Sequence, residues 1–433
     1  MPRLDNNIGL PLPWPRQSSR AGVQCAPGAG PLSLAALHAA LRKITETLAN
    51  ELGRPGAVVP DWSETEWAIA RAVAAIHGVS PLLSLRLRWR GPPGWQEFLA
   101  LQHAHTLNRH RRIEDLLRLI DRRARDDGIE IVALKGAALH AVELYRAGER
   151  PMADVDLLVS PGSLARTTAL LESLGYRESY STWKHRVFVP EIHQSQGELG
   201  EHAENYITIE VHERIGEQLL LRPRVVTHVV LPARRHPGVN SYPSLAALMI
   251  HLLLHAAGAM TFRALRLLQL SDLALLSARM TDADWRELLG YCADDGSRWW
   301  AWPPLQLTAR YYPDSVPVAV LGALAADCPW LLTRAVRRWA LSDVSFSYLW
   351  IRAFPGMVWS QSASETLSYA ASRVWPGRDV SAMRKLALDN HVVASHSQWD
   401  RLSQGRRVLR WLSTRQARPD TLFAVRAALA QPP

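Results

Sequence analysis

The sequence predicts an α+β fold in which a small mixed β-sheet core is flanked by N-terminal and C-terminal helical regions. Apolar residues recur at helical spacing between residues 31 and 125, and again over most of the chain after residue 241. Between these regions, residues 126–240 contain short β-branched runs that alternate with helical segments. The chain has 433 residues, more than the roughly 250–300 at which single cores stop growing, so two or three structural units are expected.

The composition indicates a packed protein in a reducing compartment. Hydrophobic residues make up 48% of the chain and charged residues 21%, which is enough apolar material for a core and argues against wholesale disorder. The three cysteines, Cys25, Cys292 and Cys328, lie far apart and form no CxxC pair. A disulfide framework or a structural zinc site is therefore not expected.

The termini and the charge of the chain bear on its location and partners. Residues 1–30 are rich in Pro, Gly and Ser and are predicted to form a flexible tail without the continuous apolar run of a secretory signal. No stretch offers the near 20 uninterrupted apolar residues of a membrane span, so a cytoplasmic protein is expected. The net charge of +10 comes almost entirely from arginine. It indicates either attraction to a nucleotide or nucleic acid, or arginines scattered over a solvated surface.

The N-terminal helical region, residues 31–125, carries clear helix signals. Ser63 followed by Glu66 forms a capping box immediately before an apolar stripe that extends to His77. A long amphipathic segment then runs from Gly94 to Arg125 and predicts a helix that is exposed on one side.

Residues 126–240 contain the predicted α/β core. The stretch GIEIVALKG predicts a strand ending at Lys135-Gly136, AALHAVELY a helix, and ADVDLLVS a second strand after the break at Arg150-Pro151. A helix over Pro161–Leu174 follows, and further strands are expected across residues 176–189 and 206–212. This order predicts a mixed sheet with helices packed on it, followed by the C-terminal helical region over residues 241–433.

Two aspartates interrupt the second strand of the core. Because successive side chains of a strand point to opposite faces, Asp154 and Asp156 project from the same face, about 6–7 Å apart. In YITIEVHERI, Glu210 is likewise an acid in the middle of a good strand. Carboxylates held this close repel one another unless a cation lies between them, and oxygen ligands suit Mg²⁺. The three acids therefore predict a metal site for phosphoryl chemistry, with a solvated strand face as the alternative.

The turn at Lys135-Gly136 strengthens this prediction, because a strand that ends there and opens a helix can receive a phosphate group. The combined pattern resembles the DNA polymerase β-type nucleotidyltransferase superfamily, in which a Gly-Ser-like turn and a helix precede an hDhDh strand and a third acid. The stretches LKGAALHAVELY, ERPMADVDLLV and TIEVHERI resemble more closely the family of uncharacterised nucleotidyltransferases, over about residues 60–290.

The resemblance implies a role for each motif residue. Asp154, Asp156 and Glu210 match the three acids that hold two Mg²⁺ ions, and Lys135 and Gly136 replace the Gly-Ser of the superfamily. Arg150 matches the arginine before the acidic pair, and His212 lies on the acid-x-His strand, where it would bind a metal-bound carboxylate, bind the substrate, or be satisfied locally. The sequence departs from the superfamily pattern because Ala137, and not Ser, follows Gly136.

Several other polar residues allow competing interpretations. His251 and His255 have the i, i+4 spacing of zinc ligands, but no H-E-x-x-H pattern accompanies them. Asp272 lies in an apolar helix and predicts a buried ion pair. Lys184, His185 and Arg186 fit either a triphosphate contact or an exposed hairpin face. Three close tryptophans fit core packing better than stacking on a base: Trp299, Trp300 and Trp302.

The resemblance and the acid spacing together predict a metal-dependent nucleotidyltransferase. It would move an NMP from an NTP, with ATP favoured, to an unidentified hydroxyl or amine acceptor on a peptide, a protein or a small molecule. Nucleic acid is a less favoured acceptor, and no membrane partner is expected. Two alternatives stay open: a kinase that transfers the γ-phosphoryl group on the same fold, and a non-catalytic nucleotide-binding module.

Overall fold

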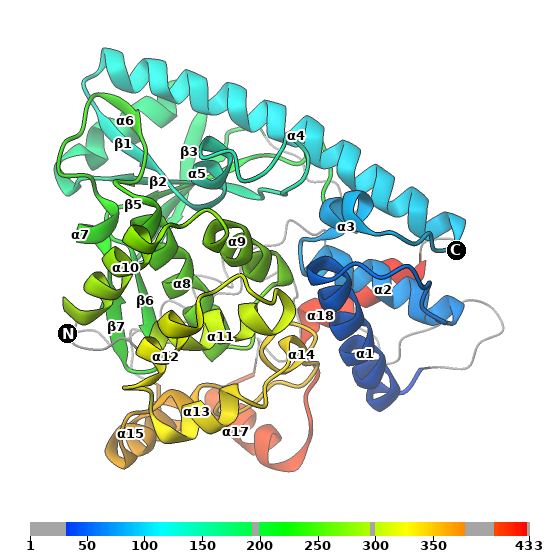
Figure 1. Ribbon diagram of the computed structural model, residues 1–433. Helices are drawn as coiled ribbons and strands as arrows, with labels where there is room; N and C mark the ends of the chain where they lie inside the picture. Colours follow the sequence, from blue (N-terminus) through cyan, green and yellow to red (C-terminus); the bar gives the residue numbers. More distant parts are fainter. Residues whose placement is uncertain (1–31, 193–198, 295–298, 377–401, 431–433) are drawn as a thin grey trace.

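The computed structural model describes residues 32–192, 199–294, 299–376 and 402–430. The tail predicted for residues 1–30 lies outside the described residues. Figure 1 shows a sheet beneath one long helix, with the C-terminal helices below the sheet in this view. The predicted α+β class with a mixed sheet is confirmed.

The N-terminal helices are α1 (Leu34–Gly53), α2 (Glu64–Ile76), α3 (Ser80–Arg86) and α4 (Pro93–Asp126). The predicted capping box is present, because the Ser63 side chain accepts from the Glu66 backbone and the Glu66 carboxylate accepts from the Ser63 backbone. Helix α4 runs along the sheet in Figure 1 and buries Ile113, Ile120 and Ala124 against it.

The central sheet has six strands in the order β3-β4-β5-β2-β1-β8. Their bounds are β1 Glu130–Ala133, β2 Asp154–Val159, β3 Tyr176–Ser181, β4 His185–Pro190, β5 Thr208–His212 and β8 Gly238–Asn240. Strand β2 pairs with β5 in parallel and with β1 antiparallel, so the sheet is mixed. A separate hairpin, β6 (Gly216–Leu219) and β7 (Arg222–Val225), follows β5.

The two faces of the sheet bury different side chains. The face covered by α4 and α6 (Leu164–Ser173) is apolar and includes Val155, Leu157 and Ile209. The short helix α5 (Lys135–Ala141) and α8 (Leu245–Thr261) pack on the opposite side, where the charged residues of β2 and β5 project. Alternation along the strands therefore separates a hydrophobic layer from a polar one.

The C-terminal helical region surrounds α8 and returns to the N-terminal helices. Besides α8, it contains α9 (Leu267–Ser277), α10 (Asp282–Asp294), α11 (Trp302–Tyr311), α12 (Val318–Ala325), α13 (Trp330–Val336), α14 (Leu341–Val344), α15 (Ala363–Val374), α17 (Gln404–Ser413) and α18 (Pro419–Ala430); the short helix α7 (Thr227–Val230) precedes the region. Helix α18, drawn in red in Figure 1, packs against α2 near the other end of the chain.

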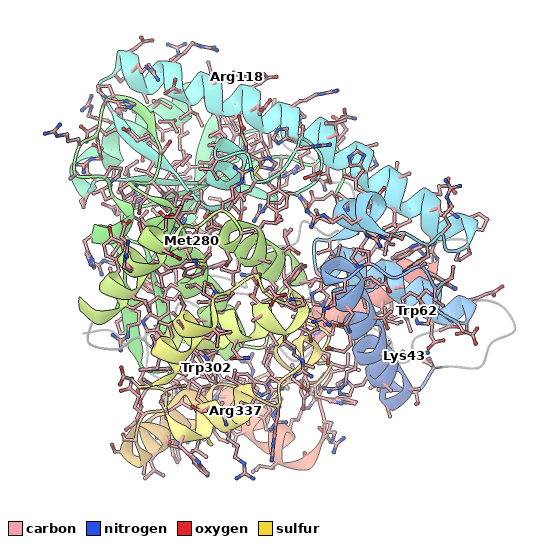
Figure 2. The ribbon with its side chains drawn as sticks, in the orientation of Figure 1. Lys43, Trp62, Arg118, Met280, Trp302 and Arg337 are labelled. Carbon is pink, nitrogen blue, oxygen red and sulfur yellow. The ribbon has the colours of Figure 1, made fainter. Side chains whose placement is uncertain are left out.

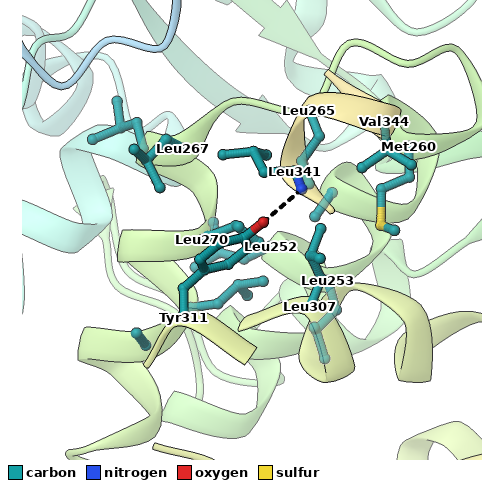
Figure 3. Packing of buried hydrophobic residues seen from close by; sticks show 14 of the residues in the cluster. Leu252, Leu253, Met260, Leu265, Leu267, Leu270, Leu307, Tyr311, Leu341 and Val344 are labelled. Carbon is teal, nitrogen blue, oxygen red and sulfur yellow. Dashed lines mark hydrogen bonds between the residues drawn. The ribbon is translucent and has the colours of Figure 1, made fainter. Parts of the chain in front are cut away.

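One hydrophobic core joins the N-terminal and C-terminal helices. Figure 3 shows Leu252, Leu253 and Leu270 of this core around Tyr311, whose hydroxyl accepts a hydrogen bond from the Leu341 backbone at 2.7 Å. The prediction of core packing for the three close tryptophans is confirmed, since Trp299, Trp300 and Trp302 are all buried. Trp302 lies among the C-terminal helices in Figure 2.

Two smaller observations complete the fold. Within the described ranges, no single helix is long and apolar enough to cross a membrane, although the bent pair α2 and α3 has sufficient length and apolar composition together. Cys292 and Cys328 are free, and Cys25 lies outside the described residues.

Candidate active site

The parallel pairing of β2 with β5 brings the three predicted acids together. Asp156 lies opposite Glu210, and Asp154 lies opposite Thr208 in the next pair along the same face. Asp156 and Glu210 are buried, with 4% and 3% of their surface exposed, whereas Asp154 is only partly buried. Period-two alternation alone places each acid on its face, and the parallel register brings the two strands' acids level with each other.

Arg109 of α4 holds the starts of these two strands together. Its guanidinium donates to the carbonyls of Met152 and Ala153 before β2 and to those of Asn205 and Tyr206 before β5, at 2.6–3.1 Å. Its side chain is 2% exposed. Sequence reasoning missed this residue. The available signal was its position four residues before Ile113, in the phase of the buried stripe of α4.

Lys135 is the cation within the acidic cluster. It is the first residue of α5, so this helix begins earlier than predicted, and its φ of 44° lies in the left-handed region. Its ammonium donates to Asp156 Oδ1 at 2.6 Å. Burial alone would lower the pKa of Lys135, but the charges of Asp156, Glu210 and Asp154 together raise it, so the side chain is charged.

Gly136 allows a close approach at this turn. A Cβ atom at this position would lie 2.6 Å from Arg150 Nη1 and 2.9 Å from Met152 Cγ, so a larger residue would displace the buried Arg150 side chain. Packing against Arg150 and Met152 therefore requires a glycine at position 136, whatever the role of this turn in binding a phosphate. Helix α5 has seven residues, which makes it shorter than the predicted helix.

The three carboxylates have different partners. Asp156 accepts hydrogen bonds from Lys135 and bonds to His212 Nε2 at 3.0 Å, and these groups outweigh burial to lower the pKa of Asp156. Within the described part of the chain, the Asp154 carboxylate has no hydrogen bond or ion pair. Burial, followed by the charges of Asp156 and Glu210, raises the pKa of Asp154 to about 7.

Two histidines lie beside Glu210. His212 Nε2 is 3.6 Å and His185 Nδ1 is 3.4 Å from Glu210 Oε2, and burial lowers the pKa of His185 to about 4. The exposed hairpin face is wrong for His185, because only 13% of its side chain is exposed, whereas contact with a triphosphate stays a prediction. The antiparallel pairing of β4 with β5 sets His185 opposite His212.

The two basic residues next to His185 in the sequence form ion pairs away from Glu210. Lys184 pairs with Glu217, and Arg186 pairs with Glu178 at 3.1 Å. His255 Nδ1 lies 3.5 Å from Glu217 as well. These basic side chains therefore balance acids on the β3–β4 and β6–β7 hairpins.

Arg150 forms a buried ion pair with Asp272 of α9. Its Nε and Nη2 atoms donate to the two carboxylate oxygens at 2.8 and 2.9 Å, and Tyr145 donates to the same carboxylate at 2.8 Å. The predicted structural ion pair of Asp272 is confirmed. Arg150 thus links the residues before β2 to α9 and lies against the turn at Gly136. Its guanidinium is bonded to the Asp272 carboxylate in this arrangement.

The histidines of α8 have separate partners. His251 Nδ1 bonds to the hydroxyl of Tyr242 at 2.6 Å, and that hydroxyl also lies 3.4 Å from the backbone nitrogen of Lys135.

Two donor sets on this face could hold a cation: the carboxylates of Asp154, Asp156 and Glu210, and the group of His185, Glu210 and His212.

Comparison with known proteins identifies the family. A family model described as an uncharacterised nucleotidyltransferase matches residues 63–313, which is more than half of the 433 residues. The match agrees with the resemblance seen over about residues 60–290. No curated protein and no solved structure matches the chain. The match includes all of the motif residues on β2, β5 and the turn between β1 and α5. The chain therefore belongs to the family of uncharacterised nucleotidyltransferases.

Proposed function

We propose that the protein transfers an NMP group from an NTP, with ATP favoured, to a hydroxyl or amine acceptor in a metal-dependent reaction. The observation that carries the proposal is the set of three acids on one face of two parallel strands, with the Lys135 ammonium in contact with Asp156. A peptide, a protein or a small molecule is the favoured class of acceptor, and nucleic acid is less favoured.

The residues present fit the binding of Mg²⁺. Three carboxylates face one ammonium group, so the cluster has uncompensated negative charge in a largely buried position. Among the described residues, the Asp154 carboxylate has no hydrogen-bond or ion-pair partner, and its pKa is raised. A bound cation would supply that partner. Asp154, Asp156 and Glu210 would hold the metal. Bound Mg²⁺ ions would offset the charge of the phosphates and polarise the α-phosphoryl group.

The side chains of the protein supply orientation and charge around the reacting groups. His212 and Lys135 hold the Asp156 carboxylate from two sides, at 3.0 and 2.6 Å. Arg150 is held by Asp272, so it supports the turn at Gly136 and contributes only at longer range to the charge near the phosphates. This chain lacks the serine that follows the glycine in the superfamily pattern. The Lys135 ammonium could compensate for the absent hydroxyl by contacting a phosphate as a point charge.

The proposed transfer is an in-line substitution at the α-phosphorus. A bond forms between the acceptor oxygen or nitrogen and the α-phosphorus, and the bond from that phosphorus to the bridging α–β oxygen breaks. Pyrophosphate leaves with the electron pair of the broken bond. The proton of the acceptor passes to the Glu210 carboxylate, which projects from the same face as the two aspartates.

The proposal is tested with α-labelled and γ-labelled ATP, Mg²⁺ and a panel of acceptors that includes the protein itself. We expect α-label on the product, and a loss of at least about 100-fold in rate for Asp154→Asn and Asp156→Asn, since both remove charge from the metal site. Asp115→Asn is the matched control, because Asp115 is 75% exposed on α4 and pairs with Arg118 of the same helix.

Each outcome distinguishes one of the alternatives. Product that carries γ-label would make the protein a kinase. Binding of ATP and Mg²⁺ by calorimetry without labelled product from any acceptor would favour the non-catalytic module. Wild-type rates of α-label transfer by Asp154→Asn would refute the assignment of the acids.

A further inference from the structure

His185, Glu210 and His212 form a second group of donors on the polar face of the sheet. The strands β4 and β5 supply all three, with His185 directly opposite His212 and Glu210 two residues before His212. One ligand atom from each residue lies within 4.8 Å of the other two. At most 13% of any of the three side chains is exposed.

The two distances to Glu210 in this group are close to those between ligands of a bound first-row metal ion. His185 Nδ1 is 3.4 Å and His212 Nε2 is 3.6 Å from Glu210 Oε2. Ligand atoms at about 2.0–2.1 Å from a tetrahedral ion are separated by roughly 3.3–3.4 Å. These two separations are close to that value, and the ligand atoms of the group all lie within 4.8 Å of one another, so shifts of the side chains would bring them to one ion.

One of the donor atoms has no other role in the structure. His185 Nδ1 is buried and has no hydrogen-bond partner among the described residues, because its approach to Glu210 lacks hydrogen-bond geometry. A buried nitrogen without a partner loses its hydration without compensation. A metal ion would satisfy this nitrogen directly.

The donor types select the class of ion. Imidazole nitrogen suits Zn²⁺ and other first-row transition ions, whereas Mg²⁺ prefers oxygen ligands in a near-ideal octahedron. Two imidazoles with one carboxylate therefore differ in kind from the neighbouring pair of aspartates. Asp156 Oδ1 borders the group, 3.0 Å from His212 Nε2. A bound metal ion would replace the hydrogen bond between these two atoms, and Asp156 would keep its bond from Lys135.

We propose that His185 Nδ1, His212 Nε2 and the Glu210 carboxylate bind one divalent first-row transition ion of the Zn²⁺ and Co²⁺ type. The inference goes beyond the proposed function and shares only Glu210 with its set of acids. It assigns His185 as a metal ligand from a strand that carries none of the three acids, and it predicts that Mg²⁺ does not compete effectively for this position.

The test measures metal binding without nucleotide. The full-length protein is freed of metal with a chelator and titrated with Co²⁺, whose visible absorption reports the number and type of ligands. We expect one equivalent of Co²⁺ to bind, Zn²⁺ to displace it, and a large excess of Mg²⁺ to leave it in place. His185→Gln should weaken the binding at least about tenfold. His255→Gln is the matched control, a partly buried histidine near Glu217 and outside the group.

A second variant keeps the proposal testable if His185→Gln folds poorly. His185→Cys should retain Co²⁺ and add the charge-transfer absorption of a thiolate ligand, because the new sulfur would occupy the position of the lost nitrogen. Wild-type affinity in His185→Gln, ready displacement by Mg²⁺, or no thiolate band in folded His185→Cys would each overturn the inference.

These outcomes are independent of the test for nucleotidyl transfer. If Asp154→Asn loses α-label transfer but binds Co²⁺ normally, both proposals stand. If His185→Gln binds Co²⁺ normally and Asp154→Asn loses transfer, only the metal inference fails. If wild-type protein binds Co²⁺ through His185 but transfers no label, only the proposed activity fails.

Discussion

At the scale of single residues, Lys135 and Arg150 each form an ion pair with one acid. Lys135 bonds to Asp156 and Arg150 bonds to Asp272, both with little exposed surface. Buried ion pairs of this kind stabilise a particular arrangement more than they stabilise the fold, since desolvation offsets most of the attraction. The pairs therefore determine which basic group faces the acids, and that group is Lys135.

His77 links the N-terminal helices to the start of α9. Its Nδ1 accepts from the Leu267 backbone at 3.0 Å, so the proton of the neutral ring lies on Nε2, which donates to Ser347 at 2.9 Å. Complete burial, together with the charge of Arg266, lowers the pKa of His77 to about 3. Protonation would break the bond that holds the first turn of α9, the helix of Asp272.

This depressed pKa predicts a pH dependence of stability. Between about pH 6.5 and pH 3 the unfolded chain binds a proton at His77 that the folded protein excludes, so the free energy of unfolding falls as the pH falls. The contribution is about 1 kcal/mol per pH unit across that window. His77→Gln should unfold at lower denaturant concentration at pH 7 but show a smaller loss of stability between pH 6.5 and pH 4.5.

Denaturant unfolding at several pH values checks this prediction. His228→Gln, at an exposed position, is the control, and its pH slope should exceed that of His77→Gln. Equal slopes for the two variants would show that His77 does not exclude a proton in the folded protein.

At the scale of secondary-structure elements, the position of the acids depends on how β2 and β5 begin. Both strands start at carbonyls that accept from Arg109, a residue of a different element. Helix α4 also covers the apolar face of the same strands. One helix therefore both packs against the sheet and holds the N-terminal ends of β2 and β5 at a fixed separation.

Replacing Arg109 tests this role. Arg109→Met keeps most of the apolar side chain but removes four buried hydrogen bonds to backbone carbonyls, so we expect a loss of roughly 3–5 kcal/mol in the free energy of unfolding. The proposed nucleotidyl transfer should fall as well in protein that remains folded, because the acids would lose their register. Arg122→Met, at an exposed position on α4, should change neither quantity.

The same scale explains which elements could be predicted. Strands β1, β2 and β5 and the helix α6 follow from their own apolar patterns, and each was predicted within a few residues. Strand β8 has three residues and exists because it pairs with β1 in parallel, so its own pattern carries no signal. The hairpin of β6 and β7 was missed because its pattern resembles a loop, and contact with α8 supports it.

At the scale of the whole molecule, the last helix completes the N-terminal part of the core. Helix α18 buries Ala424, Val425 and Ala428 against α2, and Arg71 of α2 donates to the carbonyl of Ala428. The matched family region ends at residue 313, yet the packing of its first helix depends on residues about 100 positions later.

Two substitutions in the C-terminal helices separate this packing from surface effects. Val425 is fully buried, so Val425→Asp should lower the free energy of unfolding by roughly 3 kcal/mol or more. Leu412 of α17 is 83% exposed, and Leu412→Asp should change stability by no more than about 0.5 kcal/mol. Thermal and denaturant unfolding measure both. A Val425→Asp protein as stable as Leu412→Asp would mean that α18 is dispensable for the core.

The sequence by itself determined which face Asp154, Asp156 and Glu210 occupy, because alternation in a strand is a local property. It also determined the family, since the motifs are contiguous stretches of residues. The tertiary structure decided the partners: Lys135 with Asp156, Arg150 with Asp272, and His185 beside Glu210. These contacts depend on strand order, on the register between β4 and β5 and on the packing of α9. Such long-range pairings are chosen by burial and charge over the whole chain, and no local pattern encodes them.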